Sequence, residues 1–350
     1  MVKTHMVNVT IYESIEDETI RKKVIGNLTE YRDHVAGLKN ANTLRAYNAD
    51  FADYLRFCHE HDLVSMSEDW QITKGSVKGF FDFLMWRKKG TRTTLTSEER
   101  STFTSQDIQA MTLKRASITR KLAAIRYFIG IAELDDPYIK SKLLREYVSN
   151  SLNRYKPEYQ DQATPLTLEL VDELEHLLPA TTLLNIRDLM LVNVGFDTLL
   201  RASNLTMIDI NHLRLDIKSI FVPSSKTDKT GKGSLVYIGE KSISLIKLWL
   251  EKSGVVDGKL FRSLTPKKLN VKSDGLSYKG MYHAYKRLGV RLNIDGLSCH
   301  STRVGAVVSQ TERNVSIKKI IQSGQWKSER MAIRYGEKAN VNKGGMSDIR

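Results

Sequence analysis

Five residues in the second half of the chain have the types and the spacing for chemistry on a phosphate ester. His300 and Arg303 are three positions apart, Trp326 follows Arg303 by twenty-three positions, and Tyr335 follows Trp326 by nine. Arg201 lies far upstream of them. Phosphoryl transfer places negative charge on equatorial oxygens, which guanidinium groups bind bidentately. Because histidine can move a proton near neutral pH and tyrosine can form a covalent phosphoryl intermediate, the set predicts tyrosine attack on a phosphodiester.

Each of these residues, taken singly, also has an ordinary structural explanation. A His-x-x-Arg pair arises often by chance, and a tyrosine on a short helix is usually a core residue with a solvated hydroxyl. Arg201 alone would be a surface or capping charge, and Trp326 alone would be a packing residue. It is the order and spacing of the whole set, over 135 residues, that argues against chance.

Helical patterns surround the set. An apolar helix is predicted over 189–200, directly before Arg201. Ser328 is placed to cap a short helix that carries Tyr335, and Gly336 is placed to end it. The chain therefore positions its candidate chemistry mainly on helices.

One β-prone interruption breaks the helical pattern. Residues 220–222 and 235–238 are rich in β-branched and aromatic side chains and flank a turn-rich, basic segment at 224–233. This arrangement predicts a β-hairpin. The fold class expected from the sequence is therefore mainly α with one small β element.

The N-terminal half predicts three helices. The first is capped by Thr43, with apolar residues recurring at helical spacing over 44–58, and the others lie at 77–86 and 118–128. Between the last two, residues 88–111 are rich in Thr, Ser and Gln and lack an apolar period. This segment is predicted to be a long loop or a poorly ordered insert.

The length of 350 residues predicts two domains, since single hydrophobic cores stop growing at about 250–300 residues. We expect a flexible N-terminus at 1–18, a helical domain at 19–150, and a second domain at 166–350. The segment 151–165 contains two prolines and few apolar residues, so it is the predicted linker.

The charge balance points to a polyanionic partner. The chain has 54 Lys and Arg against 40 Asp and Glu, a formal net charge of +14, and nucleic acid is the first class of partner that such an excess attracts. No apolar stretch approaches the roughly 20 residues of a membrane span, and the N-terminus lacks an apolar signal core. Cys58 and Cys299 are far apart and form no disulfide framework or metal cluster, so we expect a cytoplasmic protein.

Several segments of the chain resemble segments of the tyrosine site-specific recombinases, in particular the Cre-like enzymes of phages and plasmids. The run 299–308 is similar to the His-Ser-Ala-Arg-Val-Gly segment of that group, and 315–326 resembles its continuation. Upstream, 196–201 resembles the group's Asn-Thr-Leu-Leu-Arg, while 43–58 and 117–122 resemble two of its DNA-facing helices. The likeness covers most of the chain and is most specific in the last fifty residues.

The resemblance implies a two-domain clamp that closes around a DNA duplex. Residues 19–150 would be the helical core-DNA-binding domain, and 166–350 would be the α-helical catalytic domain with its small β-hairpin. It further implies a protein encoded by a bacterium, phage or plasmid and associated with the nucleoid.

Catalytic roles are implied position by position. Tyr335 would attack the scissile phosphate and leave a 3′-phosphotyrosyl bond. Arg201 and Arg303 would hold the non-bridging oxygens. His300 and Trp326 would donate to the same phosphate, and His300 could also accept the tyrosine proton.

Two further positions follow from the comparison with the family. Lys226 would protonate the departing 5′ oxygen. Because Lys229 and Lys232 lie on the same predicted turn, the choice of Lys226 rests on its alignment with the family. For Lys229 and Lys232, the simpler explanation is that they are solvated loop lysines. Asn204 stands where the family usually has a glutamate. An amide accepts only neutral hydrogen bonds, which are roughly half as strong as charge-assisted ones, so the rate rather than the reaction type is placed in doubt.

Four residues match DNA-contacting positions of the family. They are Thr43 and Arg45 on the first predicted helix, Arg120 on the third, and Lys279 at the start of a predicted helix in the second domain. Phosphate contacts set affinity and base contacts set sequence, and Lys279 is the candidate for a guanine edge.

The function expected is a site-specific DNA recombinase. It would act as a homotetramer on short, partly palindromic double-stranded DNA sites and pass through a Holliday junction, without a cofactor or a metal ion, since the chain has no phosphate-binding glycine loop and no two-metal cluster. Two alternatives remain open: a type IB topoisomerase, and a sequence-specific DNA-binding protein with a degenerate, inactive pocket.

Overall fold

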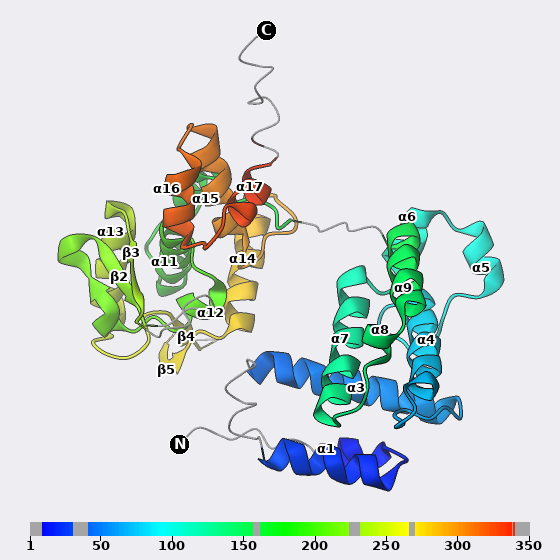
Figure 1. Ribbon diagram of the computed structural model, residues 1–350. Helices are drawn as coiled ribbons and strands as arrows, with labels where there is room; N and C mark the ends of the chain where they lie inside the picture. The colour runs from blue at the N-terminus through cyan, green and yellow to red at the C-terminus, as the bar shows by residue number, and fades with distance from the viewer. Residues whose placement is uncertain are drawn as a thin grey trace. The chain divides into compact units, whose positions relative to one another are not determined.

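The computed structural model describes residues 9–30, 41–156, 162–223, 232–265, 270–337 and 339. The chain divides into two compact units, Met1–Gln160 and Asp161–Arg350 (Figure 1). Helix α9 runs to Tyr155, into the segment 151–165 that the sequence predicts as the linker, and residues 157–161 of that segment lie outside the described residues.

The first unit is helical. Its elements are η1 (Val9–Ser14), α1 (Glu18–Glu30), α3 (Ala41–Glu60), α4 (Trp70–Trp86), α5 (Ser97–Thr102), α6 (Ser105–Met111), α7 (Arg115–Ile131), α8 (Pro137–Lys140) and α9 (Lys142–Tyr155). Polar side chains start several of them: Asp69, Asp136 and Ser141 accept hydrogen bonds from the first-turn amides of α4, α8 and α9.

Aromatic side chains form the centre of this unit. Phe51 of α3 stacks on Phe128 of α7 with ring centroids 4.3 Å apart, and Tyr54 of α3 meets Phe80 of α4 edge to face at 5.3 Å. Tyr12 of η1 packs on Phe128 with ring centroids 5.6 Å apart. The helical period of these residues in the sequence therefore marks the buried faces of α3, α4 and α7.

Three local expectations for this unit were wrong. Residues 9–18 do not form a flexible lead-in, because Tyr12 and Ile15 are buried in the aromatic core. Helix α3 begins at Ala41, so Thr43 lies within its first turn and is not its cap. The segment 88–111 is not a plain loop: it contains α5 and α6, each started by a capping box in which a threonine and an acidic residue bond each other's backbone.

The second unit combines helices with two small antiparallel sheets. Its helices are α10 (Leu168–Leu177), α11 (Leu183–Thr198), α12 (Ala202–Leu205), η2 (Ile210–His212), η3 (Leu215–Ile217), α13 (Glu240–Ser253), α14 (Tyr278–Leu292), α15 (Ser301–Glu312), α16 (Ile317–Gly324) and α17 (Arg330–Gly336). Its strands are β1 (Leu213–Arg214), β2 (Ser219–Val222), β3 (Ser234–Tyr237), β4 (Arg262–Leu264) and β5 (Val271–Gly275).

The predicted hairpin is confirmed as β2 and β3. The two strands pair antiparallel, with Val222 opposite Ser234, and β1 completes a sheet of order β1-β2-β3. Gly233 precedes β3 with a φ of 69°, and a Cβ there would lie 2.6 Å from the Phe221 ring. Only glycine therefore fits where the chain returns into β3. The mainly α fold with a small β element is confirmed.

Helix α11 lies at the centre of the second unit. It is buried over most of its length and packs against α13 and α15 (Figure 1). On α15, Gly305 passes so close to the start of α10 that an added Cβ would lie 1.8 Å from the carbonyl oxygen of Leu166. The Leu166 amide donates to the Ser301 carbonyl oxygen at 3.0 Å, which fixes this crossing.

We expect Gly305→Ala to lower the free energy of unfolding of the second unit by about 3 kcal/mol, because the new methyl group must displace backbone. Gly75→Ala on α4 is the matched control: nothing lies within 4 Å of a Cβ at this position. It should be neutral or stabilising by up to about 1 kcal/mol. Urea unfolding followed by circular dichroism measures both, and equal stability of the two variants would contradict the packing at Gly305.

Candidate active site

Five predicted catalytic residues converge in the second unit. His300 precedes α15 and Arg303 lies in its first turn, Trp326 lies between α16 and α17, Tyr335 lies on α17, and Arg201 precedes α12. His300 Nε2 is 3.0 Å from Tyr335 Oη. The Trp326 ring lies 5.9 Å from the Tyr335 ring, and the Arg303 guanidinium carbon lies 4.4 Å from the Trp326 ring centroid. The tertiary structure thus joins residues that the sequence separates widely.

The end of α11 links the two arginines. The helix ends at Thr198, and Leu199 then adopts the left-handed conformation with a φ of 51°. This conformation is uncommon for leucine, and it is held here by burial of the side chain and by a hydrogen bond from Arg303 Nη1 to the Leu199 carbonyl oxygen. Two residues later the chain reaches Arg201. The turn of the backbone after α11 therefore both binds Arg303 and leads directly to Arg201.

The turn after α16 completes the pocket. The Gly324 carbonyl oxygen accepts a hydrogen bond from Arg303 Nη2 at 3.2 Å. A Cβ on Gly324 would lie 2.1 Å from the Trp326 ring, so glycine is required for the indole to pack there. Leu199 and Gly324 were not singled out from the sequence. The Gly-x-Trp order was a usable signal for Gly324, whereas Leu199 carried none.

Two buried N–H groups in the pocket lack a hydrogen-bond partner among the described residues. They are Nε of Arg303 and Nε1 of Trp326. Buried donors are nearly always paired, and leaving one unpaired costs about 1–3 kcal/mol. Their side chains are in contact, so an anion with oxygens beside them could accept from both. The arrangement suits a phosphate.

The charges around the pocket also favour binding of an anion. Burial, and then the nearby charge of Arg201, lower the pKa of Arg303 to about 10. Burial, and then the charges of Arg303 and Arg201, also lower the pKa of His300. Arg303 therefore stays charged at neutral pH while His300 is neutral, which lets Nε2 of His300 accept a proton from Tyr335. A bound anion would relieve the repulsion between the two arginines.

The geometry of the described residues does not test the predictions made for Lys226 and Asn204. Lys226, together with Lys229, lies outside the described residues. Asn204 is buried on α12, and its Oδ1 accepts a hydrogen bond from Ser203 Oγ at 3.3 Å. Its backbone amide donates to the Arg201 carbonyl oxygen at 2.8 Å, so Asn204 belongs to the same short turn as the first arginine.

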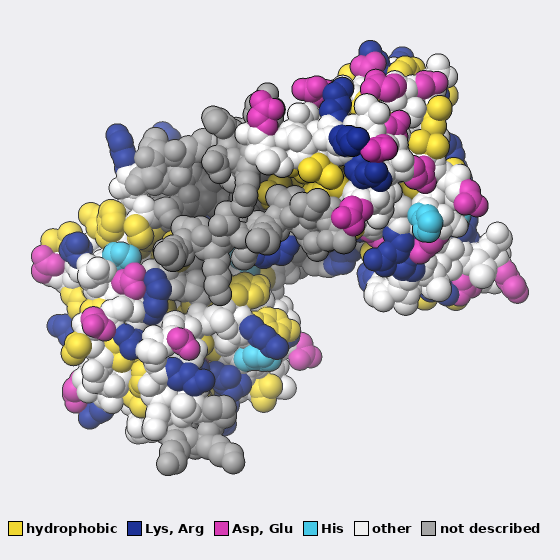
Figure 2. All heavy atoms as spheres, turned by 90° about the horizontal axis from the view of Figure 1, so that it is seen from below, with side chains coloured by type: hydrophobic (Ala, Val, Ile, Leu, Met, Phe, Trp, Pro, Cys, Tyr) yellow, Lys and Arg dark blue, Asp and Glu magenta, His cyan; other side chains and the backbone are white. Residues whose placement is uncertain are grey.

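The predicted DNA-contacting residues lie on the surfaces of the two units. Thr43, Arg45 and Lys279 are exposed, and Lys279 is the second residue of α14, whose capping residue is Ser277. Arg45 Nη1 donates to Asn42 at 3.1 Å. Figure 2 shows Lys and Arg side chains in groups on the visible face of each unit, with acidic side chains among them.

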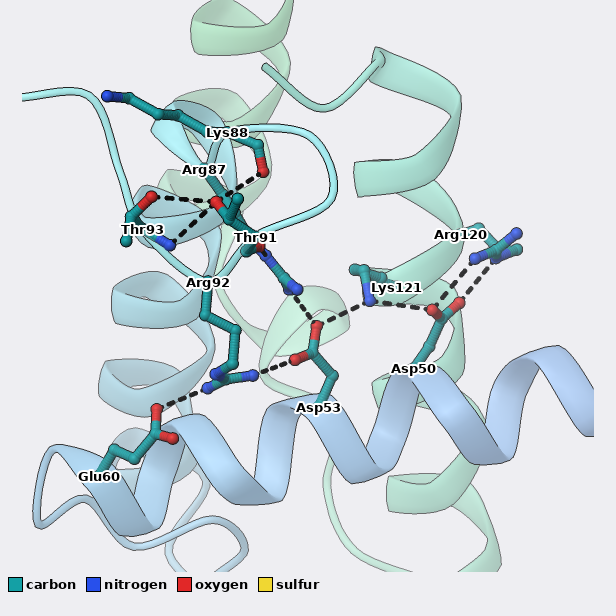
Figure 3. A network of polar contacts seen from close by, with 10 residues as sticks. All are labelled: Asp50, Asp53, Glu60, Arg87, Lys88, Thr91, Arg92, Thr93, Arg120 and Lys121. Carbon is teal, nitrogen blue, oxygen red and sulfur yellow. Dashed lines mark hydrogen bonds and ion pairs between the residues drawn. The ribbon is translucent and has the colours of Figure 1, made fainter. Parts of the chain in front are cut away.

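Arg120 belongs to a polar network on the first unit (Figure 3). Its Nε and Nη2 contact the two carboxylate oxygens of Asp50 at 2.7 and 3.1 Å, although half of its side chain is exposed. Lys121 bridges Asp50 and Asp53 at 3.0 and 2.8 Å. Because Asp50 occupies the Nε/Nη2 edge of Arg120, the N–H groups that remain for a DNA contact are those of Nη1 and the second one of Nη2.

Asp53 is the centre of this network. It also accepts from Arg87 and Arg92, which come from the connection after α4, so one carboxylate of α3 holds three cations. Burial by itself raises the pKa of Asp53, but hydrogen bonds and charge from Lys121 and Arg87 outweigh it and hold the pKa below its usual value. The stabilisation is therefore present above the unfolded pKa of about 3.9 and is lost as pH falls through the lower folded pKa.

We expect Asp53→Asn to destabilise the first unit by roughly 1–3 kcal/mol at neutral pH, because three cations lose their shared carboxylate. The difference from the unchanged protein should shrink below about pH 4. Glu60→Gln on the same helix is the matched control: Glu60 is exposed and, among the described residues, forms an ion pair with Arg92 only, so a change under about 1 kcal/mol is expected. Unfolding curves at several pH values measure this, and a pH-independent difference would contradict it.

Among the residues that the structure describes, no helix is long and apolar enough to cross a membrane, and no three His, Cys, Asp or Glu side chains are grouped as metal ligands would be.

Comparison with known proteins gives consistent matches. Residues 170–341 match the phage integrase family. A protein of Selenomonas ruminantium, described as an integrase/recombinase xerD homolog, is 24% identical over 318 residues, covering 87% of this chain and 84% of that protein.

Solved structures match over nearly the whole chain. The XerH site-specific recombinase bound to palindromic difH substrate has a TM-score of 0.56 at 12% identity, covering 97% of this chain and 93% of that one. The Tn1549 transposon integrase in complex with circular intermediate DNA has a TM-score of 0.57 at 12% identity, covering 91% and 98%. At these identities the structures show a shared fold.

Proposed function

We propose that this chain, in which residues 170–341 match the phage integrase family, is a tyrosine recombinase of the Cre-like, site-specific kind. It cleaves and rejoins DNA at short, partly palindromic sites through a 3′-phosphotyrosyl intermediate and a Holliday junction. One observation carries this proposal: the Tyr335 hydroxyl lies 3.0 Å from Nε2 of His300, beside two buried N–H groups without a partner in the described chain.

In the first step Tyr335 Oη attacks phosphorus, and its proton passes to Nε2 of His300, which requires the tautomer with Nδ1 protonated. The bond from phosphorus to the 5′ oxygen breaks, and the departing oxygen takes a proton from Lys226. Arg201 and Arg303 bind the non-bridging oxygens as their charge grows.

Trp326 Nε1 donates to the same phosphate. The phosphotyrosyl bond retains the energy of the phosphodiester, so a 5′-hydroxyl of the partner strand reverses the reaction without a nucleotide or metal cofactor. The proton that the 5′-hydroxyl releases returns to Lys226, and His300 returns its proton to Tyr335. The chain thus supplies every proton donor and acceptor that the cycle needs.

The rest of the chain supports DNA binding in this proposal. Residues 19–150 act as the core-DNA-binding domain, 151–165 as the linker and 166–350 as the catalytic domain. Thr43, Arg45 and Arg120 contact backbone phosphates through the first domain, and Lys279 contacts a base edge through the second. These assignments are supported by exposure and by the net charge of +14.

The active assembly is a homotetramer on two DNA sites, in the cytoplasm of a bacterial cell and associated with its nucleoid. Assembly requires DNA, since the predicted docking tail at 336–350 has few apolar residues. A stable tetramer by gel filtration in the absence of DNA would contradict this.

The proposal is tested by recovering the DNA that the purified protein selects from a random pool and incubating it with the protein. A denaturing gel then shows whether protein and DNA become covalently joined. We expect an adduct at one position of the selected sequence. Tight selection without any adduct would favour the second candidate, a DNA-binding protein with an inactive pocket.

That second candidate has one observation in its favour: an amide, Asn204, occupies the place of the family's carboxylate beside Arg201. Asn204→Glu distinguishes the two. A recombinase that tolerates the amide is already active and gains rate at most, whereas a degenerate pocket forms no adduct until the carboxylate is supplied.

A further inference from the structure

The first described residues of the second unit run along the helices of the candidate active site, and we call residues 162–166 the entry strap. The Leu166 amide donates to the Ser301 carbonyl oxygen at 3.0 Å. Thr164 Oγ1 donates to the Asp295 carbonyl oxygen at 3.2 Å. These two hydrogen bonds fix the strap to the first residue of α15 and to the turn that precedes this helix.

A third attachment of the strap reaches the helix that carries Tyr335. Gln162 Nε2 donates a hydrogen bond to the Arg334 carbonyl oxygen, 172 positions away in the chain. The next residue, Ala163, packs against the apolar cluster that contains Trp326 and Tyr335. The strap therefore meets α17 directly beside the candidate nucleophile.

Helix α17 depends on such outside contacts. It has seven residues, Arg330–Gly336, and isolated helices shorter than about 12–15 residues are marginal in water. The last four carbonyl groups of any α-helix also lack intrahelical partners. The Arg334 carbonyl oxygen is one of these, and the Glu337 amide lies 3.5 Å from it, longer than the usual range of about 2.7–3.2 Å. The amide of Gln162 therefore supplies a donor where the helix itself supplies a weak one.

We propose that Gln162 is a positioning residue for the nucleophile. By binding the Arg334 carbonyl oxygen it fixes the end of α17, and this keeps Tyr335 Oη 3.0 Å from Nε2 of His300 before the DNA is cleaved. Gln162 acts through the backbone of α17, and the role needs no contact between Gln162 and the DNA. This inference rests on the proposed function.

The role predicts a difference between cleavage and religation. In cleavage, the bond from Tyr335 Oη to phosphorus forms and the bond from phosphorus to the 5′ oxygen breaks. Religation reverses both bonds and the proton transfers, so the two directions share one transition state. Before cleavage only the protein holds Tyr335 in place, so loss of Gln162 should raise the barrier. After cleavage the phosphotyrosyl bond itself holds the tyrosine at the phosphate, so the barrier to religation should stay the same.

A defect in the phosphate pocket should behave differently. Loss of a donor such as Trp326 Nε1–H weakens the stabilisation of the shared transition state. Such a change therefore slows cleavage and religation together. The ratio of the two rates thus distinguishes placement of the nucleophile from stabilisation of the phosphate, and a purely structural role of Gln162 gives no reason for that ratio to change.

The experiment measures the two directions separately, with the full-length protein and the DNA site that it selects. A site nicked close to the cleavage point loses a short 5′-hydroxyl fragment by diffusion, so formation of the adduct reports cleavage alone. The rate constant is taken on DNA saturated with protein, where it does not depend on the folded fraction. An oligonucleotide with the missing 5′-hydroxyl end is then added to the purified adduct, and its joining reports religation.

The variants separate the amide donor from the rest of the strap. Gln162→Ala removes the side chain, whereas Gln162→Glu keeps its size but replaces the amide with a carboxylate that only accepts hydrogen bonds. Thr164→Val is the matched control, because it removes a different side-chain hydrogen bond of the same strap, the one to Asp295. Trp326→Phe represents a defect in the pocket.

We expect Gln162→Ala and Gln162→Glu each to slow cleavage roughly ten- to a hundredfold, the scale expected when a reacting group is misplaced by about 1 Å. Both should leave religation and the affinity for DNA unchanged. Thr164→Val should match the unchanged protein in both directions. Trp326→Phe should slow both directions.

Equal slowing of cleavage and religation in the Gln162 variants would overturn the positioning role while leaving the proposed function standing. An unchanged cleavage rate in both variants would do the same. If Thr164→Val slowed cleavage as much as Gln162→Ala, the strap as a whole rather than Gln162 would support the helix, which also contradicts the inference. Absence of an adduct from the unchanged protein would instead overturn the proposed function, and this inference with it.

Discussion

We expect Tyr335→Phe protein to bind its selected DNA site with unchanged affinity and to form no covalent adduct with it. Phenylalanine keeps the ring that packs on Trp326 and His300 but has no oxygen to attack phosphorus. The loss of adduct should therefore be complete. The free energy of unfolding should fall by only about 1 kcal/mol, the typical contribution of the lost hydrogen bond to His300.

The measurement combines a binding titration with a denaturing gel on the same DNA. Tyr237→Phe is the matched control, because Tyr237 is an exposed tyrosine on β3 and its variant should form the adduct normally. Adducts that persist in Tyr335→Phe would identify another nucleophile. Loss of both binding and adduct would mean that the tyrosine hydroxyl serves recognition rather than chemistry.

The second large effect is expected at Trp326. Trp326→Phe removes the unpaired Nε1–H while keeping an aromatic face for the Arg303 guanidinium. If that N–H donates to the phosphate only when DNA is bound, the cleavage rate should fall about 10²–10³-fold, as for other preorganised donors. Stability should fall by less than in Trp249→Phe, because the cavity left by the smaller ring is partly offset by removal of a buried donor that has no partner in the described chain.

Trp249 provides the matched contrast. Its Nε1 donates to the Leu260 carbonyl oxygen at 3.0 Å inside the core of the second unit. Trp249→Phe leaves that carbonyl unpaired and opens a cavity, so we expect a loss of roughly 2–4 kcal/mol in stability. The cleavage rate per folded molecule should be unchanged. A Trp326→Phe variant that is destabilised like Trp249→Phe, with no loss of rate, would make the indole a packing residue only.

Short-range patterns explain the part of the fold that the sequence predicts well. The helical period around Phe51, Phe80 and Phe128 and the alternation at the hairpin are properties of neighbouring residues, and α3, α4, α7, β2 and β3 follow them. Helices α5 and α6 were missed because their six and seven residues are too short to show an apolar period. Their Thr-x-x-Glu and Thr-x-x-Asp capping boxes were the available signal.

Residue type, order and spacing by themselves determined which groups could act on a phosphate: His300, Arg303, Trp326, Tyr335 and, upstream, Arg201. These are chemical properties of single side chains, and the sequence states them directly. The structure brings these five residues together.

Only the tertiary structure decided how these groups are held and which of them are free to act. The Leu199 carbonyl group that accepts a hydrogen bond from Arg303 lies 104 positions from it in the chain. The Asp50 carboxylate that binds Arg120 lies 70 positions from it. Burial, pKa shifts and unpaired donors depend on such distant contacts, because desolvation and hydrogen bonding are set by whatever the fold places within a few ångströms. Patterns among neighbouring residues in the sequence do not predict those distant contacts.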